Sequence, residues 1–267
     1  MPMARLPERI ACLSTETVDV LYDIGEEARI VGISGFTVYP PRARKEKPKI
    51  SGFSSAKIDH ILAVQPDLVL AFSNLQAGMV TELIKAGVEV HHFNQRGVED
   101  ILAMVETVGR LVGAQDKAAS LVAELEDCIA AAKAAAAKRS RKPRVYFEEW
   151  NDPLISGIGW VSELIAIAGG EDVFAELGRC HGAKERIIAD PMEVVRRAPD
   201  ILIGSWCGKK FRAEQVQVRP GWEMVPAVAN GQLHEIKSAD ILAPGPSAIR
   251  LGLAQMVRIF DEWAELG

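Results

Sequence analysis

The sequence predicts an α/β fold with two lobes, each a mostly parallel sheet flanked by helices, joined by one long backbone helix. Three observations support this: strand and helix patterns alternate at the start, an uninterrupted helical stretch follows, and the alternation then begins again. A chain of 267 residues, 48% hydrophobic and 25% charged, is long enough for two such cores. We place the N-terminal lobe at 1–113, the connecting helix at 114–140 and the C-terminal lobe at 141–267.

The N-terminal lobe shows short apolar runs separated by helical patterns. The spacing of Ile101, Val105, Val108 and Leu111 is that of one helical face. Strand–helix alternation with short turns favours a parallel sheet with helices on both faces, which binds ligands at its carboxyl edge. The predicted strands are 9–13, 29–33, 68–72 and 88–93, and the predicted helices are 15–24, 56–64, 76–85 and 98–112, with a Gly- and Pro-rich loop before Gly52.

The stretch from Ala114 to about Lys138 contains no Gly or Pro and consists mainly of Ala, Leu, Lys and Glu. This composition favours a single helix of roughly 35 Å at 1.5 Å per residue. Such a helix is long enough to run from one lobe to the other.

The C-terminal lobe repeats the pattern of the first. Val64–Leu70 and Arg197–Ile203 each read as a helix end, a Pro-Asp turn and a buried strand, which indicates a duplicated layout. The predicted strands are 144–148, 201–204 and 232–236, and the predicted helices are 160–168, 191–197 and 246–266.

Charge and composition exclude several partners. The net charge is −5 and the one basic run, 138–142, is short, so a nucleic-acid partner is not expected. No stretch approaches the ~18 apolar residues of a membrane span. The start of the chain has no apolar leader, so we expect a cytoplasmic protein, with the periplasm as the alternative if a leader was removed. The four cysteines have no CxxC spacing and read as free thiols.

Metal and catalytic chemistry are not expected either. His60, His91, His92 and His234 fall within predicted helices or strands, which leaves only His181 in a loop and predicts no bare metal site. No nucleophile elbow, Walker A or GxGxxG motif is present. Glu148 and Glu149 are adjacent on a strand and point to opposite faces, so they cannot act as a paired acid and base. We therefore expect a protein that is not an enzyme.

Nine short segments, taken in order, resemble the vitamin B12 (cobalamin)-binding type of ABC-transporter substrate-binding proteins, in the helical-backbone class. The resemblance covers nearly the whole chain, and its order and spacing favour the fold more strongly than the ligand. The segments are 9–17, 31–34, 39–41, 58–69, 87–90, 168–174, 197–201, 219–222 and 226–231.

The resemblance implies non-catalytic binding of a corrinoid, cobalamin, in the cleft between the lobes, with no catalytic cofactor. A corrin is a disc with apolar faces and an amide rim, so its site needs aromatic surface and a few polar partners. We predict ligand contacts at strand-end loops and at one helix start, by Tyr39, Phe53, Phe72, Trp150, Gly157, Trp160, Trp206 and Asp240.

Four of these contacts have a plainer alternative. Tyr39 can pack on its neighbouring prolines, Phe72 can be core, and Trp150 and Trp160 can be packing residues. Trp222 and Trp263 are assigned to packing. The resemblance also implies an arginine four residues after Asp240, where this chain has Pro244. His181 is a candidate axial ligand to the metal of a corrin or haem.

The resemblance further implies docking on an ABC permease through one glutamate from each lobe. The two positions fall at Ala77 and Met192, with Glu193 next to the second, which counts against a permease partner. Two other functions stay open: a periplasmic receptor for haem or a ferric siderophore that feeds an ABC importer, and an enzyme that acts on a bound tetrapyrrole.

Overall fold

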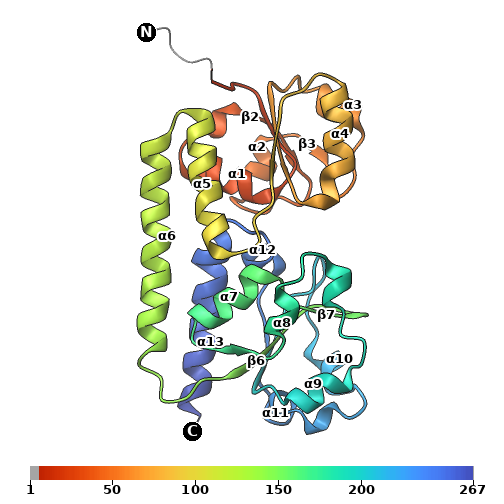
Figure 1. The fold of residues 1–267 in the computed structure, drawn as a ribbon, viewed down its shortest axis with the longest axis vertical. Coiled ribbons are helices and arrows are strands. Elements are labelled where there is room, and N and C mark those ends of the chain that lie inside the picture. The colour runs from red at the N-terminus through yellow and green to blue at the C-terminus, as the bar shows by residue number, and fades with distance from the viewer. Residues whose placement is uncertain (1–5, 267) are drawn as a thin grey trace. The chain divides into compact units, whose positions relative to one another are not determined.

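The computed structural model describes residues 6–266, and the chain divides into two compact units (Figure 1). Unit 1 holds the described residues up to Gln95 together with Glu99–Leu125. Unit 2 holds Arg96–Val98 and the described residues from Glu126 onward. Both units are α/β, as the sequence predicts.

Unit 1 contains a five-stranded sheet of order β3-β2-β1-β4-β5 in which every neighbouring pair is parallel. The strands read as near-continuous apolar runs because helices cover both of their faces. In β4 (Leu68–Phe72), for example, all five residues are buried. The strands are β1 (Ile10–Cys12), β2 (Ile30–Ser34), β3 (Lys49–Ser51), β4 (Leu68–Phe72) and β5 (Val90–Phe93).

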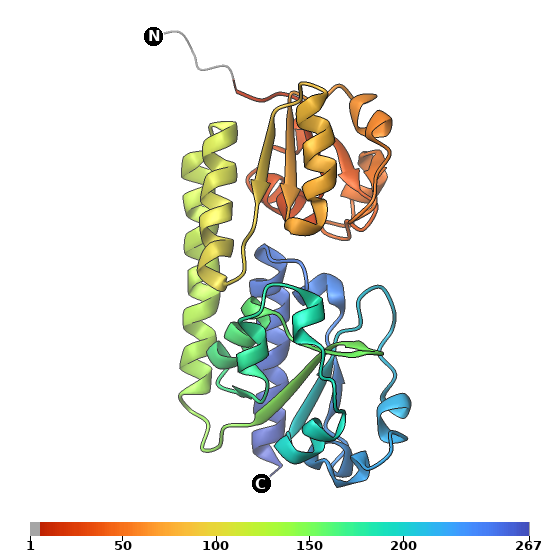
Figure 2. The ribbon, with the colours of Figure 1, turned by 45° about the vertical axis from the view of Figure 1, so that its right-hand side comes forward.

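Helices lie on both sides of this sheet. Ile61 of α3 and Leu83 of α4 pack on Ala11, Val69 and Ala71 on one face, and α1 and α5 lie on the other side (Figure 1). In the view of Figure 2, α4 lies in front of the strands. The helices are α1 (Thr15–Asp23), α2 (Ala43–Glu46), α3 (Ile58–Leu62), α4 (Ala77–Lys85) and α5 (Val98–Val112), with short 3-10 turns at Glu27–Arg29 and Asn74–Gln76.

A single helix, α6 (Gln115–Ala136), belongs to both units. Its 22 residues correspond to roughly 33 Å at 1.5 Å per residue. It is counted with unit 1 as far as Leu125 and with unit 2 from Glu126. The predicted long connecting helix is therefore present.

Unit 2 contains a sheet of order β10-β9-β6-β7, with β8 paired to the start of β6. Its pairs are parallel except β6–β7, which form an antiparallel hairpin. The strands are β6 (Arg144–Asn151), β7 (Leu154–Ser156), β8 (Glu171–Asp172), β9 (Ile201–Gly204) and β10 (Leu233–Glu235). The helices are α7 (Gly159–Ile167), α8 (Ala175–Gly178), α9 (Met192–Arg197), α10 (Ala213–Gln217), α11 (Pro226–Ala229), α12 (Ser238–Ile241) and α13 (Ala254–Glu265), with 3-10 turns at Ala183–Arg186 and Trp222–Met224 and a π-helical turn at Ala248–Leu253.

The core of unit 2 is rich in aromatic residues. Tyr146, Phe174, Trp206 and Trp222 are buried together with aliphatic neighbours, and Tyr146 makes edge contacts with the rings of Phe174 and Trp222. The expectation that Trp222 packs inside the protein is confirmed. Within residues 6–266, no helix is both long and apolar enough to span a membrane.

Candidate functional site

The carboxyl edge of the unit 1 sheet is organised by one buried glutamine. The strand order reverses between β1 and β4, and this is where parallel sheets commonly bind ligands. Gln76 lies there with no exposed surface. Its amide nitrogen donates to the carbonyl oxygens of Leu13 (2.9 Å) and Phe53 (2.8 Å), and its amide oxygen accepts the Phe72 N–H at 2.9 Å. Gln76 therefore fixes the loop that carries Phe53.

Two of the predicted ligand-contacting aromatics form a pair at this edge. The rings of Phe53 and Phe72 lie 6.4 Å apart between centroids and are tilted by 51°. Phe72 is 5% exposed and backs the half-buried Phe53. Phe53 is therefore the member of the pair with surface left for a ligand.

Tyr39 is half-buried in the loop after β2. Near it in sequence, and after β1, are polar side chains with little or no exposed surface: Ser14, Glu16 and Thr37. Within the described residues, Ser14 Oγ, Glu16 Oε1 and Thr37 Oγ1 have no hydrogen-bond partner. Burial raises the pKa of Glu16 to about 7. This edge thus combines aromatic surface with buried polar side chains.

In unit 2, the two adjacent carboxylates of β6 each hold an arginine. Glu148 is fully buried, and its oxygens accept from both terminal nitrogens of Arg219 (2.6 and 2.8 Å) and from the Trp206 indole N–H (2.9 Å). Glu149 accepts two bonds from Arg186, at 2.7 and 3.0 Å. The two carboxylates bind different arginines, so the pairs are separate. Both carboxylates are acceptors in two-pronged ion pairs, a strong and geometrically specific arrangement.

Trp150 lies beyond these pairs, at the end of β6, and is half-buried. Its indole N–H donates to the Asp152 carbonyl oxygen at 2.7 Å, which fixes the ring against its own turn. The ammonium of Lys209 lies 4.1 Å from the centre of the Trp150 ring and 5.0 Å from that of Trp206. Trp206 itself is 2% exposed. Of these two predicted contacts, only Trp150 offers ring surface to a ligand.

The remaining predicted residues of unit 2 lie in its interior. Trp160 is 3% exposed and donates its indole N–H to the Ile241 carbonyl oxygen at 2.9 Å. Gly157 is buried, and a side chain there would meet Val161 and Phe147 at 3.3–3.5 Å. Asp240 is 8% exposed and accepts a bond from Gln255 at 3.0 Å. These positions favour packing roles, and ligand contact by them stays a prediction.

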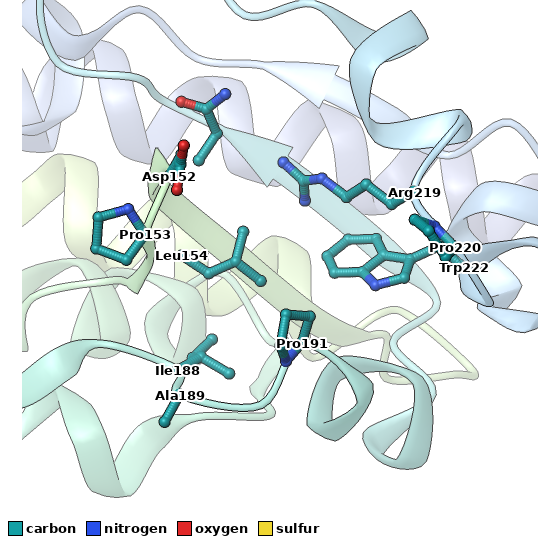
Figure 3. Close-up of a pocket in the computed structure, with 10 residues that line it drawn as sticks. Asp152, Pro153, Leu154, Ile188, Ala189, Pro191, Arg219, Pro220 and Trp222 are labelled. Carbon is teal, nitrogen blue, oxygen red and sulfur yellow. The ribbon is translucent and has the colours of Figure 1, made fainter.

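A cavity of about 370 Å³ lies within unit 2 (Figure 3). Arg219 stacks on Trp222 in its wall, with the guanidinium 4.4 Å from the ring centre. The volume is at the lower end for small-molecule pockets and too small for a whole corrin. The cavity is lined by residues of the β6–β7 turn, the segment before α9 and the segment after α10: Asn151, Asp152, Pro153, Leu154, Ile188, Ala189, Pro191, Arg219, Pro220 and Trp222.

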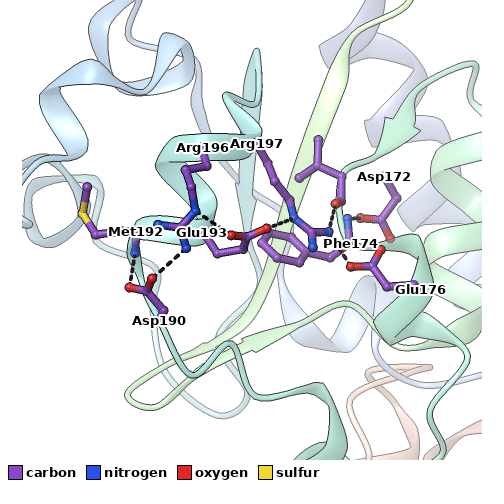
Figure 4. A network of polar contacts seen from close by, with 9 residues as sticks. Asp172, Phe174, Glu176, Asp190, Met192, Glu193, Arg196 and Arg197 are labelled. Carbon is purple, nitrogen blue, oxygen red and sulfur yellow. Dashed lines mark hydrogen bonds and ion pairs between the residues drawn. The ribbon is translucent and has the colours of Figure 1, made fainter.

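Helix α9 carries a network of surface ion pairs (Figure 4). Glu193 accepts from Nε of both Arg196 and Arg197 at 2.8 Å, and Arg196 also bonds Asp190 at 2.7 Å. Arg197 in turn lies 4.2 Å from the ring centre of Phe174. Glu193, which lies next to the permease-docking position implied at Met192, is thus engaged by arginines of its own helix. Docking on a permease stays a prediction.

His181 is exposed in the loop after α8, and its role as an axial ligand also stays a prediction. Among residues 6–266, no three His, Cys, Asp or Glu side chains are grouped so that they could hold a metal ion.

Reasoning from the sequence missed Gln76, Arg186, Lys209 and Arg219. A glutamine four residues after the end of a buried strand, and a lysine three residues after a strand-end tryptophan, were signals in the sequence. The arginines had none, because they lie 37 and 71 residues from the carboxylates that they bind.

Comparison with known proteins gives relatives that span nearly the whole chain. A cobalamin-binding protein of Halobacterium salinarum is 25% identical over 261 residues, covering 95% of this chain and 69% of the relative. A vitamin B12-binding protein of Vibrio parahaemolyticus is 25% identical over 254 residues, covering 93% and 88%.

Solved structures share the fold. A periplasmic haem-binding protein from Roseiflexus sp. RS-1 superimposes with a TM-score of 0.84 at 22% identity, covering 96% of this chain and 99% of that one. The periplasmic vitamin B12-binding protein of Vibrio cholerae gives 0.75 at 19% identity, covering 96% and 98%. The model of the periplasmic binding protein family matches residues 10–239, well over half of the sequence, so the chain belongs to the periplasmic binding protein family.

Proposed function

We propose that this protein binds a corrinoid, with cobalamin as the first candidate, and releases it chemically unchanged. The observation that carries the proposal is the alignment with two relatives named for cobalamin or vitamin B12, which covers 95% and 93% of the chain. The family match covers residues 10–239 and therefore includes segments of both units.

The aromatic surfaces at the carboxyl edges of the two sheets support this ligand class. Tyr39 and Phe53 in unit 1 and Trp150 in unit 2 are half-buried rings that retain exposed surface. Aromatic faces of this kind suit the apolar faces of a corrin. We assign direct contact to these three residues. Phe72 supports Phe53 from behind.

The state of the two β6 carboxylates supports binding without turnover at the edge of the unit 2 sheet. A general acid or base must reach the proton that it transfers. Glu148 and Glu149 instead hold Arg219 and Arg186 in two-pronged pairs, and Glu148 has no exposed surface. Neither carboxylate is therefore available as an acid or base at the edge of the unit 2 sheet.

The test is a calorimetric and spectroscopic titration of the purified chain with cobalamin, haemin and a ferric hydroxamate siderophore. We expect heat and a spectral change with cobalamin, and unchanged cobalamin on chromatography after long incubation. W150A should weaken binding at least tenfold, since removing an aromatic anchor costs roughly 2 kcal/mol.

W263A is the matched control, because Trp263 lies on α13 under Arg141 and away from the sheet edge. It should leave affinity unchanged. If haemin binds and cobalamin gives neither heat nor a spectral change, the ligand assignment is wrong. A cobalamin spectral shift that H181A abolishes would assign the axial ligand to His181.

A further inference from the structure

Lys209 is an exposed cation in the loop after β9, and it lies against aromatic rings. The turn that carries it is closed by the Lys209 N–H, which donates to the Trp206 carbonyl oxygen at 3.2 Å, and Gly208 has φ +75°. The ammonium lies 4.1 Å from the Trp150 ring centre and donates to Asn151 Oδ1. A cation held over an indole face is attracted by the ring quadrupole, so the flexible lysine is oriented in advance.

The hydrogen bond of the Lys209 ammonium goes to a neutral amide and not to a carboxylate. The two acidic residues of the adjoining strand, Glu148 and Glu149, are taken by Arg219 and Arg186. Within residues 6–266, Lys209 forms no ion pair. An ammonium has three N–H donors, of which Asn151 uses one. Two donors and a net positive charge therefore remain beside the half-buried ring of Trp150.

We propose that Lys209, positioned by Trp150 and Asn151, is an anion subsite for the acidic substituent of the bound ligand. This inference rests on the proposed binding function and adds a specificity residue to it. In a corrinoid the matching group is the phosphodiester of the nucleotide arm, and in a haem it is a propionate carboxylate. Both accept charge-assisted hydrogen bonds from an ammonium.

The experiment compares K209M with K210M in the full chain. Lys210 carries the same charge one residue further on, is also exposed, and makes no ring contact within the described residues. Cobalamin and cobinamide, a corrinoid without the phosphodiester, are titrated by calorimetry at low and moderate salt. Haemin and its dimethyl ester form a second pair of ligands. This pair shows whether the acidic group that Lys209 binds is a carboxylate and not a phosphodiester.

If the acidic group that Lys209 binds is the phosphodiester of a corrinoid, K209M should lose roughly tenfold or more in cobalamin affinity. This is the size expected for a hydrogen bond to a charged group. Its cobinamide affinity should not change, and K210M should match the wild type with both ligands. K209R should recover most of the loss. The cobalamin affinity of K209M should also depend less on salt, since one charge contact is gone.

Affinities of K209M that equal those of the wild type for both cobalamin and haemin, or losses that are as large with cobinamide and with the haemin dimethyl ester, would overturn the subsite while leaving the proposed function in place. A loss with haemin but not with its dimethyl ester would assign the subsite to a carboxylate. A wild-type chain that binds none of these ligands overturns both the function and the subsite.

Discussion

At the scale of single residues, Glu16 is the clearest case of chemistry set by burial. It is the second residue of α1, is 2% exposed, and has one carboxylate oxygen without a hydrogen-bond partner among the described residues. Burial raises its pKa from 4.5 to about 7, with a smaller contribution from the Asp19 carboxylate. The folded protein therefore retains a proton at Glu16 that the unfolded chain releases above about pH 4.5.

We predict that E16Q removes part of the pH dependence of stability. The wild-type folded state binds more protons than the unfolded state between pH 4.5 and about 7, so its stability falls as pH rises through that window. The loss attributable to Glu16 is of the order of 3 kcal/mol, at about 1.36 kcal/mol per pKa unit. Urea unfolding at pH 5 and pH 8 should show E16Q to be the more stable protein at pH 8.

The control for this experiment is E82Q, at an exposed residue paired with Lys85. It should keep the wild-type pH dependence. Wild type and E16Q curves that run parallel from pH 5 to pH 8 would show that Glu16 does not hold this proton.

At the residue scale, the sequence did not predict the partners that side chains bind. Glu148 and Glu149 do act separately, as predicted, since they bind Arg219 and Arg186. The same strand-end reasoning predicts ligand contact by Trp206. In the structure Trp206 is buried and its indole N–H donates to Glu148 of β6, and ligand contact by it stays a prediction. Such a bond depends on tertiary contacts that no local pattern contains.

At the scale of elements, Gly109 explains how α5 lies against the start of α6. A Cβ built on Gly109 would lie 2.3 Å from the Cβ of Ala118 and 3.3 Å from the Ala114 carbonyl oxygen. The Ala114 N–H also donates to the Gly109 carbonyl oxygen at 2.8 Å. Glycine in a helix interior normally costs about 1 kcal/mol relative to alanine. Close approach of the two helices accounts for glycine at this position.

We therefore predict that G109A destabilises the protein, although alanine has the higher helix propensity. The matched control is G78A in α4, where no atom lies within 4 Å of the added Cβ. That variant should be stabilised, by up to about 1 kcal/mol. Urea unfolding of both variants gives the comparison. Shifts of the two midpoints in the same direction would contradict the packing explanation for Gly109.

The strands that the sequence missed are short and held by pairing. β3 is three residues directly after Pro48, and it lies in a segment that the Gly and Pro content assigned to a loop. It forms because Ile33 and Ser34 of β2 offer an open edge. β6 extends to Asn151 for a similar reason, since β7 pairs with its polar end. Longer periodic elements, such as α5 at Val98–Val112, matched their predicted bounds.

At the scale of the whole molecule, α6 is the element that both units share. It enters unit 2 at Glu126, an exposed residue in the middle of the helix. Because the helix is continuous across this point, loss of structure in one unit removes part of a helix that the other unit uses. We therefore expect the wild type to unfold in a single transition.

We predict that E126P separates the unfolding of the two units. Proline removes a helical hydrogen bond and clashes with the preceding turn, at a cost of about 3 kcal/mol. All five tryptophans, at positions 150, 160, 206, 222 and 263, lie in unit 2, so tryptophan fluorescence reports that unit alone. Far-UV circular dichroism reports both units. In E126P the two signals should give different urea midpoints, whereas in the wild type and in E126A they should coincide. Coincident midpoints in E126P, even if both are lowered, would show that contacts other than the continuity of α6 couple the units.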